Sequence, residues 1–355
     1  MRIHLLTAIS VTALSLTAAS AFAQSASPAT GSTYHASRNG WGQPDLQGTY
    51  TTATITPLTR DKRFGTRNVL TKPEADALEA ATQAQIARAD APTPPDATVK
   101  DLKNADCGPD GISGFNCGYN QGWKDPGTKL IDFNGEKHAS IITSPADGQL
   151  PPRVASAGDP QAARARAMRT RTDNPEGFSL GERCLLSFGS SAGPPMLPLM
   201  YNNTYQIVQS KDEVAIDVEM VHDVRHIRLN AQHGPANMKL WMGDSIGHWE
   251  GDTLVVETIN MRPEQGLRGA SPNQKVIERF TRISPTQIKY AFTVEDPTVY
   301  KAPFSGEVSF NATKGQVYEY ACHEGNYALT GMLAGARAEE KKQAQAAGAA
   351  KSGGE

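Results

Sequence analysis

The chain has 355 residues, of which 39% are hydrophobic and 20% are charged, and its 35 basic and 37 acidic residues leave a net charge of -2. This balance excludes a general nucleic-acid-binding protein, which needs a basic excess to neutralise phosphates. The hydrophobic content excludes a chain that is disordered throughout. Behind the N-terminal segment no apolar run reaches the roughly 18 residues that a transmembrane helix needs, so we expect no membrane span in the mature protein.

The first 23 residues have the three parts of a secretory signal peptide. Arg2 supplies the positive charge, residues 5–19 form a short apolar run, and Ala21-Phe22-Ala23 is a cleavage site of the A-x-A type. The sequence therefore predicts removal of residues 1–23 and export to the periplasm or the medium. An uncleaved membrane anchor is the alternative.

After the signal peptide, residues 24–40 are rich in Ser, Ala and Thr without any period, and we expect a flexible leader there. Residues 41–337 are then predicted to form a single domain. Within it, Thr71-Lys72-Pro73-Glu74 combines a capping box with a proline in the first turn, which predicts a helix that runs to about Ala89.

The following part of the chain has few regular elements. Residues 91–127 are rich in Pro and Gly and are expected to form a loop, whereas residues 138–143 include a short strand. Residues 161–171 contain four arginines among alanines, which predicts an exposed helix with a solvated charged face.

From about residue 200 the pattern changes to strict alternation of apolar and polar residues, which is typical of half-buried strands. The apolar residues from Val214 to Val224 fall on one parity. Further strands are predicted at 252–259, 275–283, 287–295, 307–311 and 316–320. The fold class is therefore mainly β: an antiparallel meander over about 200–322 that closes into a barrel or packs as a sandwich, decorated by the N-terminal helix and long loops. The tail, 338–355, is expected to be disordered.

Four cysteines follow the signal peptide: Cys107, Cys117, Cys184 and Cys322. An even number in an exported protein predicts two disulfides. Cys107 and Cys117 lie ten residues apart and suit a local loop, which leaves Cys184 to pair with Cys322. A zinc site is the competing interpretation, but no pair has C-x-x-C spacing.

Two long motifs are distinctive: G-D-S-I-G-H-W-E-G-D-T-L-V-V at 243–256 and Y-E-Y-A-C-H-E-G-N at 318–326. Shorter ones lie at 44–48, 118–120, 145–148 and 182–185. Together they resemble a large, mostly uncharacterised family of secreted bacterial proteins. The resemblance covers most of 41–337 and implies export and a shared fold, but no reaction. The chain departs from the family pattern before Ser140, where His138-Ala139 replaces an expected Arg-Thr.

The first candidate polar cluster contains His222 and Arg225, with Glu219, Asp223 and His226 beside them. His222 and His226 have the H-x-x-x-H spacing of a zinc protease, but that motif works only on a helix. The alternating flanks predict a strand, where positions i and i+4 lie about 13 Å apart. We therefore predict no metal at this cluster.

The second cluster contains Asp244, His248 and Glu250, and it is flanked by Trp241 and Trp249. The Gly-Asp-Ser sequence lacks the G-x-S-x-G elbow of a serine hydrolase. A loop and hairpin turn held by Asp244 is the structural alternative. The tryptophans either cap a core or stack on a sugar or aromatic ligand.

The third cluster is His323-Glu324, directly after Cys322. A disulfide at Cys322 would fix the backbone here. A histidine next to a carboxylate can serve as a general acid or base near neutral pH.

If the three clusters share one cavity, they form a site for proton transfer. The catalytic candidates are His323, Glu324, His222, Arg225 and Asp244, and the ligand-binding candidates are Trp241, Trp249, His248 and Glu250. No phosphate-binding loop is present, so no nucleotide cofactor is expected, and no metal or other cofactor is predicted. The sequence predicts an exported protein that acts on a small carbohydrate or aromatic molecule, as a cofactor-free lyase, isomerase or hydrolase. A non-catalytic binding protein or an envelope-associated structural protein is the alternative, and no protein partner is identified.

Overall fold

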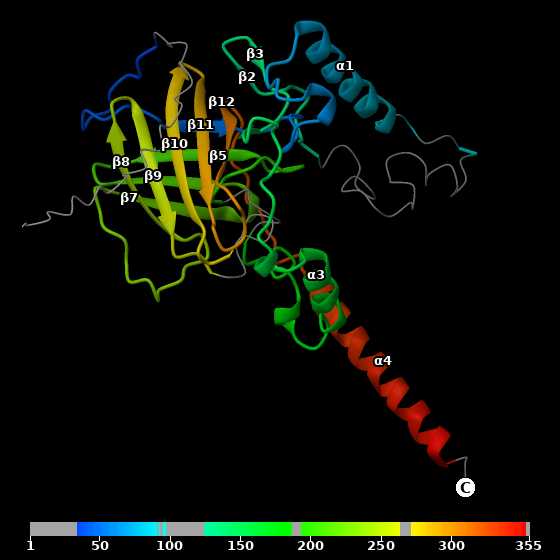
Figure 1. Ribbon diagram of the computed structural model, residues 1–355. Helices are drawn as coiled ribbons and strands as arrows, with labels where there is room; N and C mark the ends of the chain where they lie inside the picture. Colours follow the sequence, from blue (N-terminus) through cyan, green and yellow to red (C-terminus); the bar gives the residue numbers. More distant parts are fainter. Residues whose placement is uncertain are drawn as a thin grey trace, which may run out of the picture. The chain divides into compact units, whose positions relative to one another are not determined.

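Nine strands close into a β-barrel in the computed structural model, which describes residues 34–90, 92, 95–96, 124–186, 193–262 and 271–352 (Figure 1). The strands are β1 (Gly48–Thr51), β5 (Thr204–Gln209), β6 (Glu213–Val218), β7 (Asp223–Leu229), β8 (Asp244–Glu250), β9 (Thr253–Ile259), β10 (Lys275–Ser284), β11 (Gln287–Glu295) and β12 (Phe304–Ala312). The barrel closes because β1 pairs with β5 on one side and with β12 on the other. The predicted mainly β fold is confirmed, and it is a barrel.

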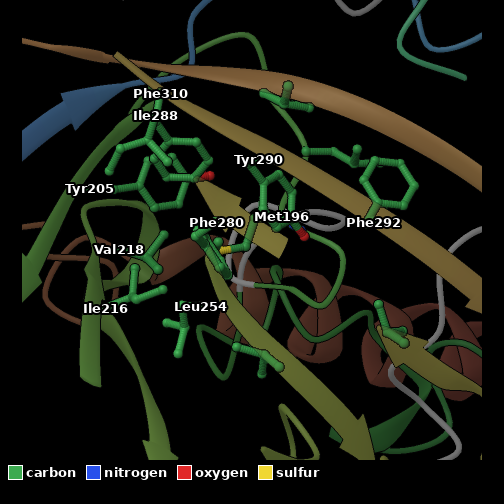
Figure 2. Packing of buried hydrophobic residues seen from close by; sticks show 14 of the residues in the cluster. Met196, Tyr205, Ile216, Val218, Leu254, Phe280, Ile288, Tyr290, Phe292 and Phe310 are labelled. Carbon is green, nitrogen blue, oxygen red and sulfur yellow. The ribbon is translucent and has the colours of Figure 1, made fainter. Parts of the chain in front are cut away.

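The alternating side chains of the strands fill the barrel. In β11 and β6 every second residue is buried, and β10 follows the same pattern over most of its length. The inward positions carry large aromatic rings, among them Tyr205, Phe280, Tyr290 and Phe310 (Figure 2). The ring centroids of Phe280 and Tyr290 lie 4.8 Å apart in a tilted arrangement. Aromatic side chains bury the largest apolar areas of any residues, so this cluster supplies much of the core.

Two features of the predicted meander are wrong. Strands β7 and β8 are parallel, with Ile227 opposite Ser245, because residues 230–243 carry the chain back before β8 begins. The alternation also breaks between β6 and β7, where Met220–His222 forms a 3-10 turn and both Val221 and His222 have positive φ angles. This turn reverses the parity, so that Val224 is 38% exposed and Arg225 points inward.

The predicted strand at 316–320 does not form. Strand β12 ends at Ala312, and β1 already pairs with its last two residues, so the closed barrel offers no edge there for a further strand. Three short strands lie outside the barrel wall: β4 (Ile142–Ser144), which pairs with β12, and the hairpin of β2 (Asp132–Phe133) and β3 (Glu136–Lys137).

The helix predicted from Thr71 is confirmed as α1 (Lys72–Ala89), with both hydrogen bonds of the capping box present. The exposed arginine-rich helix is α3 (Pro160–Arg169), and 3-10 turns occur at Lys62–Phe64, Ala155–Ala157 and Pro175–Gly177. The tail was expected to be disordered, but α4 (Tyr327–Ser352) runs through it, because its Ala, Lys, Glu and Gln residues favour a helix. None of the described helices has the length and apolarity to cross a membrane.

Order also begins earlier than the predicted leader boundary at residue 40. Ala36 is already buried, and Arg38 donates a hydrogen bond of 2.6 Å to Asp252 in the β8–β9 turn. The rest of the predicted leader and the signal peptide lie outside the described residues.

Candidate functional site

A groove of about 1550 Å³ lies at the end of the barrel where β1, β6 and β12 finish and β5 begins. Thr51, Thr204 and Glu219 belong to this rim, and nine residues between Gly315 and Asn326 also line the groove. The groove therefore collects segments that are distant in sequence. Its volume exceeds the roughly 300–1,000 Å³ of ordinary ligand pockets, so a small organic molecule would fill only part of it.

A disulfide joins two walls of the groove. Cys184 and Cys322 are bonded across a sequence separation of 138 residues, which confirms this predicted pair. Asn326 reinforces the junction, because its side-chain amide donates a hydrogen bond of 2.8 Å to the carbonyl oxygen of Glu182. The other predicted pair, Cys107 with Cys117, lies outside the described residues.

Glu219 places a buried carboxylate at the groove. It follows β6 and is only 6% exposed. Its Oε1 accepts a hydrogen bond of 2.7 Å from the side chain of Asn202, whereas its Oε2 is buried and has no hydrogen-bond partner among the described residues. A buried polar atom without a partner costs free energy, so a native structure that keeps one calls for an explanation.

Asp125 is the second carboxylate of the groove. Asp125 is exposed as a residue, but desolvation by the protein around its carboxyl group raises the pKa of the side chain, and the nearby negative charge of Glu219 raises it further. The backbone of Asp125 is fixed, since its N–H donates to the carbonyl oxygen of Met200 at 2.7 Å and its carbonyl oxygen accepts from Asn203 at 2.8 Å. Asp125 and Glu219 therefore form an electrostatically coupled pair on a rigid frame.

Aromatic side chains complete the lining. Tyr201, Tyr318 and Tyr320 all border the groove, and Tyr318 is 66% exposed. The ring of His222 lies behind this wall and donates a hydrogen bond of 3.2 Å from Nδ1 to the carbonyl oxygen of Tyr320. His222 of the first cluster thus contacts the segment just before the third cluster.

His323 and Glu324 are not part of the lining. They lie on the exposed turn that follows Cys322, and the groove is bordered by their neighbours Cys322 and Gly325 instead. The disulfide fixes the backbone at this turn, as expected, but it does not bring these two side chains into a cavity. These two candidates therefore do not share the groove with Glu219 of the first cluster.

Arg225 does not line the groove either, because its side chain is buried inside the barrel. Its guanidinium donates two hydrogen bonds, of 2.9 and 2.7 Å, to the two carboxylate oxygens of Glu278. Tyr290 donates a further bond of 2.7 Å to Glu278. Arg225 therefore belongs to a buried polar network of the core and contacts no cavity that the structure describes.

Asp244 supports the long loop before β8. It accepts hydrogen bonds from the backbone N–H of Gly234 and from Arg228, both at 2.6 Å, and from His233 at 3.2 Å. Burial alone would raise the pKa of Asp244, but these donors outweigh it and lower the pKa below its usual value. The other ring nitrogen of His233 lies 3.2 Å from Glu257, so this cluster ties the loop to β9.

The remaining candidates follow β8 away from the groove. Asp223 begins β7, and β8 runs parallel to β7, so His248 and Glu250 lie near the other end of these strands. Their exposed side chains contact each other at 3.2 Å. Trp249 packs against the core, and Trp241 is half-buried with the guanidinium of Arg262 stacked 4.1 Å from its ring. None of the candidates of the second cluster lines the groove, because β8 runs away from it.

The sequence revealed only part of this groove. Glu219 was visible as a member of the first cluster, but Asp125 follows a long irregular segment and carries no periodic signal. Tyr318 and Tyr320 were not identified as lining residues, because residues 316–320 were predicted to form a strand. Besides Glu219, the predicted Cys184–Cys322 disulfide pointed to the groove, because it identified two segments that would meet there.

Comparison with family models, curated proteins and solved structures finds no match for this chain, so its function is argued from the groove alone.

Proposed function

We propose that the protein is exported and acts on a small molecule bound in the groove, by cofactor-free proton transfer at Asp125 and with Glu219 as the anchor for the ligand. The supporting observation is the Oε2 atom of Glu219, which is buried in the groove wall and has no hydrogen-bond partner among the described residues. Because this oxygen is closed off from water, a ligand reaches it by displacing the groove surface that covers it, and a hydrogen bond donated by the ligand would then remove the cost of leaving it unpaired.

Asp125 suits proton transfer because its pKa is raised. An ordinary aspartate is ionised well below neutral pH, whereas a carboxyl group that keeps its proton longer can donate it to a reacting atom. Two carboxylates whose environments differ are a common arrangement for such chemistry. Burial is the main cause of the shift at Asp125, so the effect would persist when the charge of Glu219 is neutralised by a ligand.

The rest of the groove supports a polar organic substrate, either a carbohydrate or an aromatic metabolite. Tyrosine faces stack on sugar rings and on aromatic rings, and the amides of Asn202 and Gln316 offer hydrogen bonds in the same wall. The signal peptide predicted from the sequence and the Cys184–Cys322 disulfide both support an oxidising compartment outside the cytoplasm.

A non-catalytic binding protein is the second candidate. The high exposure of Tyr318 favours it, because a wide groove admits water to the bound ligand, whereas active sites often exclude it. The two candidates agree on the location of the ligand and differ in whether a product forms.

Two variants separate the role of Asp125 in proton transfer from the role of Glu219 in ligand binding. In a screen of disaccharides and phenolic glycosides with product detection by mass spectrometry, Asp125→Asn should lower turnover by about 100- to 10,000-fold while the ligand still binds. Glu219→Gln should instead weaken binding. Glu213→Gln, at the other end of β6 and paired with His226 on the surface, is the matched control and should change neither quantity.

Stability provides an independent check on Glu219. Because Glu219→Gln removes a buried charge without a full set of partners, this variant should unfold at an equal or higher urea concentration than the original protein. Unchanged turnover in Asp125→Asn would contradict the catalytic proposal. Unchanged binding in Glu219→Gln, or a marked loss of stability, would contradict the role of Glu219 as a ligand anchor.

A further inference from the structure

We infer that the ligand of the groove carries a protonated amine, which is held between the carboxylate of Glu219 and the ring of Tyr318. This inference rests on the proposed function of the groove and names the chemical class of its ligand, an organic ammonium ion.

The charge of the lining favours a cation. Its described residues include four carboxylates and one lysine: Asp125, Glu182, Glu219, Glu319 and Lys124. One of the carboxylates, Glu182, is already paired with Arg171, which leaves the others to set the potential of the groove. Lys124 donates no hydrogen bond to the buried oxygen of Glu219. A groove with this excess of negative charge attracts cations and repels anions.

The state of Glu219 distinguishes an ammonium ion from a neutral hydroxyl group. A sugar hydroxyl would donate one hydrogen bond to Oε2, but it would leave the buried negative charge uncompensated next to Asp125. An ammonium group donates the same hydrogen bond and also neutralises the charge. Charge-assisted hydrogen bonds are about twice as strong as neutral ones, and buried charges are normally paired.

The lining also offers a face to the cation. Tyr318 is 66% exposed at the groove, although a tyrosine ring is large enough to bury most of its area in a core. Ammonium groups bind over such rings through the cation–π interaction. The neighbouring Tyr320 is held in place through its carbonyl oxygen by His222, so the wall that carries Tyr318 is anchored.

Matched pairs of probes test this inference by isothermal titration calorimetry on the purified protein. The first pair is tyramine and 2-(4-hydroxyphenyl)ethanol, which differ in an amine against a hydroxyl group. The second pair is the glucosamine trimer and the N-acetylglucosamine trimer. In at least one pair the amine should bind about tenfold more tightly than its neutral counterpart, and added salt should weaken the binding of the amine.

The variants assign the effect to named side chains. Glu219→Gln should abolish the preference for the amine, whereas Glu213→Gln should preserve it. Tyr318→Ala should weaken amine binding about two- to fivefold, because an exposed cation–π contact contributes modestly. Both effects are measured on folded protein, which the urea midpoint of each variant verifies.

Three results would overturn the inference: neutral probes that bind as tightly as the amines, an amine preference that survives in Glu219→Gln, or no binding of either amine. They differ in what they say about the proposed function. If neutral probes bind and Glu219→Gln weakens them, the groove remains the site and only the charge of the ligand is wrong. If Asp125→Asn and Glu219→Gln change no activity or binding of any probe, the proposed function fails as well.

Discussion

The guanidinium of Arg225 and the carboxylate of Glu278 are nearly inaccessible to water, although both are charged. Burial would lower the pKa of Arg225, but the charge of Glu278 outweighs it and raises the pKa, so Arg225 keeps its charge. The removal of two charges from water costs several kcal/mol for each ion, and the bidentate geometry with the added bond from Tyr290 offsets that cost. The pair is therefore expensive to break but adds little net stability.

This view predicts a difference between single and double substitutions. Arg225→Met should lower the free energy of unfolding by about 3–5 kcal/mol, because it leaves Glu278 charged and unpaired in the core. Arg225→Met combined with Glu278→Met should recover most of that loss. Urea unfolding followed by tryptophan fluorescence measures both. Equal losses in the single and the double variant would show that the pair itself stabilises the barrel.

At the scale of the element, α4 combines two different surroundings. Near its start, Ala328 and Met332 border the groove, and Arg337 donates hydrogen bonds to the carbonyl oxygens of Thr172 and Asp173. The residues after Arg337 whose burial is described are all exposed, and Glu340 pairs with Arg337 one turn before it. The second half of the helix is therefore held by its own propensity, through its Ala-rich composition.

A truncation separates the two halves. Removal of all residues after Arg337 should reduce the helical signal in far-UV circular dichroism but change the free energy of unfolding by less than about 0.5 kcal/mol, because exposed residues and surface ion pairs contribute little. Removal of all residues after Asn326 is the comparison and should lower ligand affinity, since Met332 would be lost. A large loss of stability on removal of the residues after Arg337 would mean that the end of α4 packs against the rest of the protein.

For the molecule as a whole, the Cys184–Cys322 bond connects the segment before β5 to the segment after β12. It closes a loop that contains eight of the barrel strands, β5 to β12. Such a bond restricts the unfolded chain, and it also holds two groove walls together.

Cys184→Ser with Cys322→Ser should therefore lower the free energy of unfolding by about 2–4 kcal/mol. It should also weaken ligand binding at the groove more than Arg225→Met does at a urea concentration where both remain folded. Calorimetric titration with the same probes measures this. Unchanged affinity in the double serine variant would mean that Asn326 and the backbone alone maintain the groove.

Much of the fold was predictable because one-sided burial imposes a period of two on a strand. The apolar positions of 287–295 predicted β11 for this reason, and the capping box at Thr71 predicted the start of α1. The parity of Val224 was not predictable, because the turn at Val221 and His222 depends on positive φ angles that the apolar pattern does not encode. The parallel pairing of β7 with β8 depends likewise on the path of residues 230–243.

The site was predictable only where covalent chemistry linked two segments. The even number of cysteines led to the Cys184–Cys322 bond and hence to the region of the groove. Asp125 could not be found in this way, since its approach to Glu219 depends on Asn203, which bonds to Asp125 and Leu199 at once. His323 and Glu324 misled because adjacent residues in a turn can face solvent while their neighbours face the groove.

The pairing of β1 with β12 means that the first barrel strand in the chain completes its hydrogen bonds only with the last. A ribosome or a secretion channel that releases the N-terminus first must therefore deliver nearly the entire polypeptide before the barrel can shut, and such distant pairing slows folding. Until then the edges of β1 and β11 stay unsatisfied and open to wrong partners. A nascent chain of this design can complete the groove only after Cys322 has emerged.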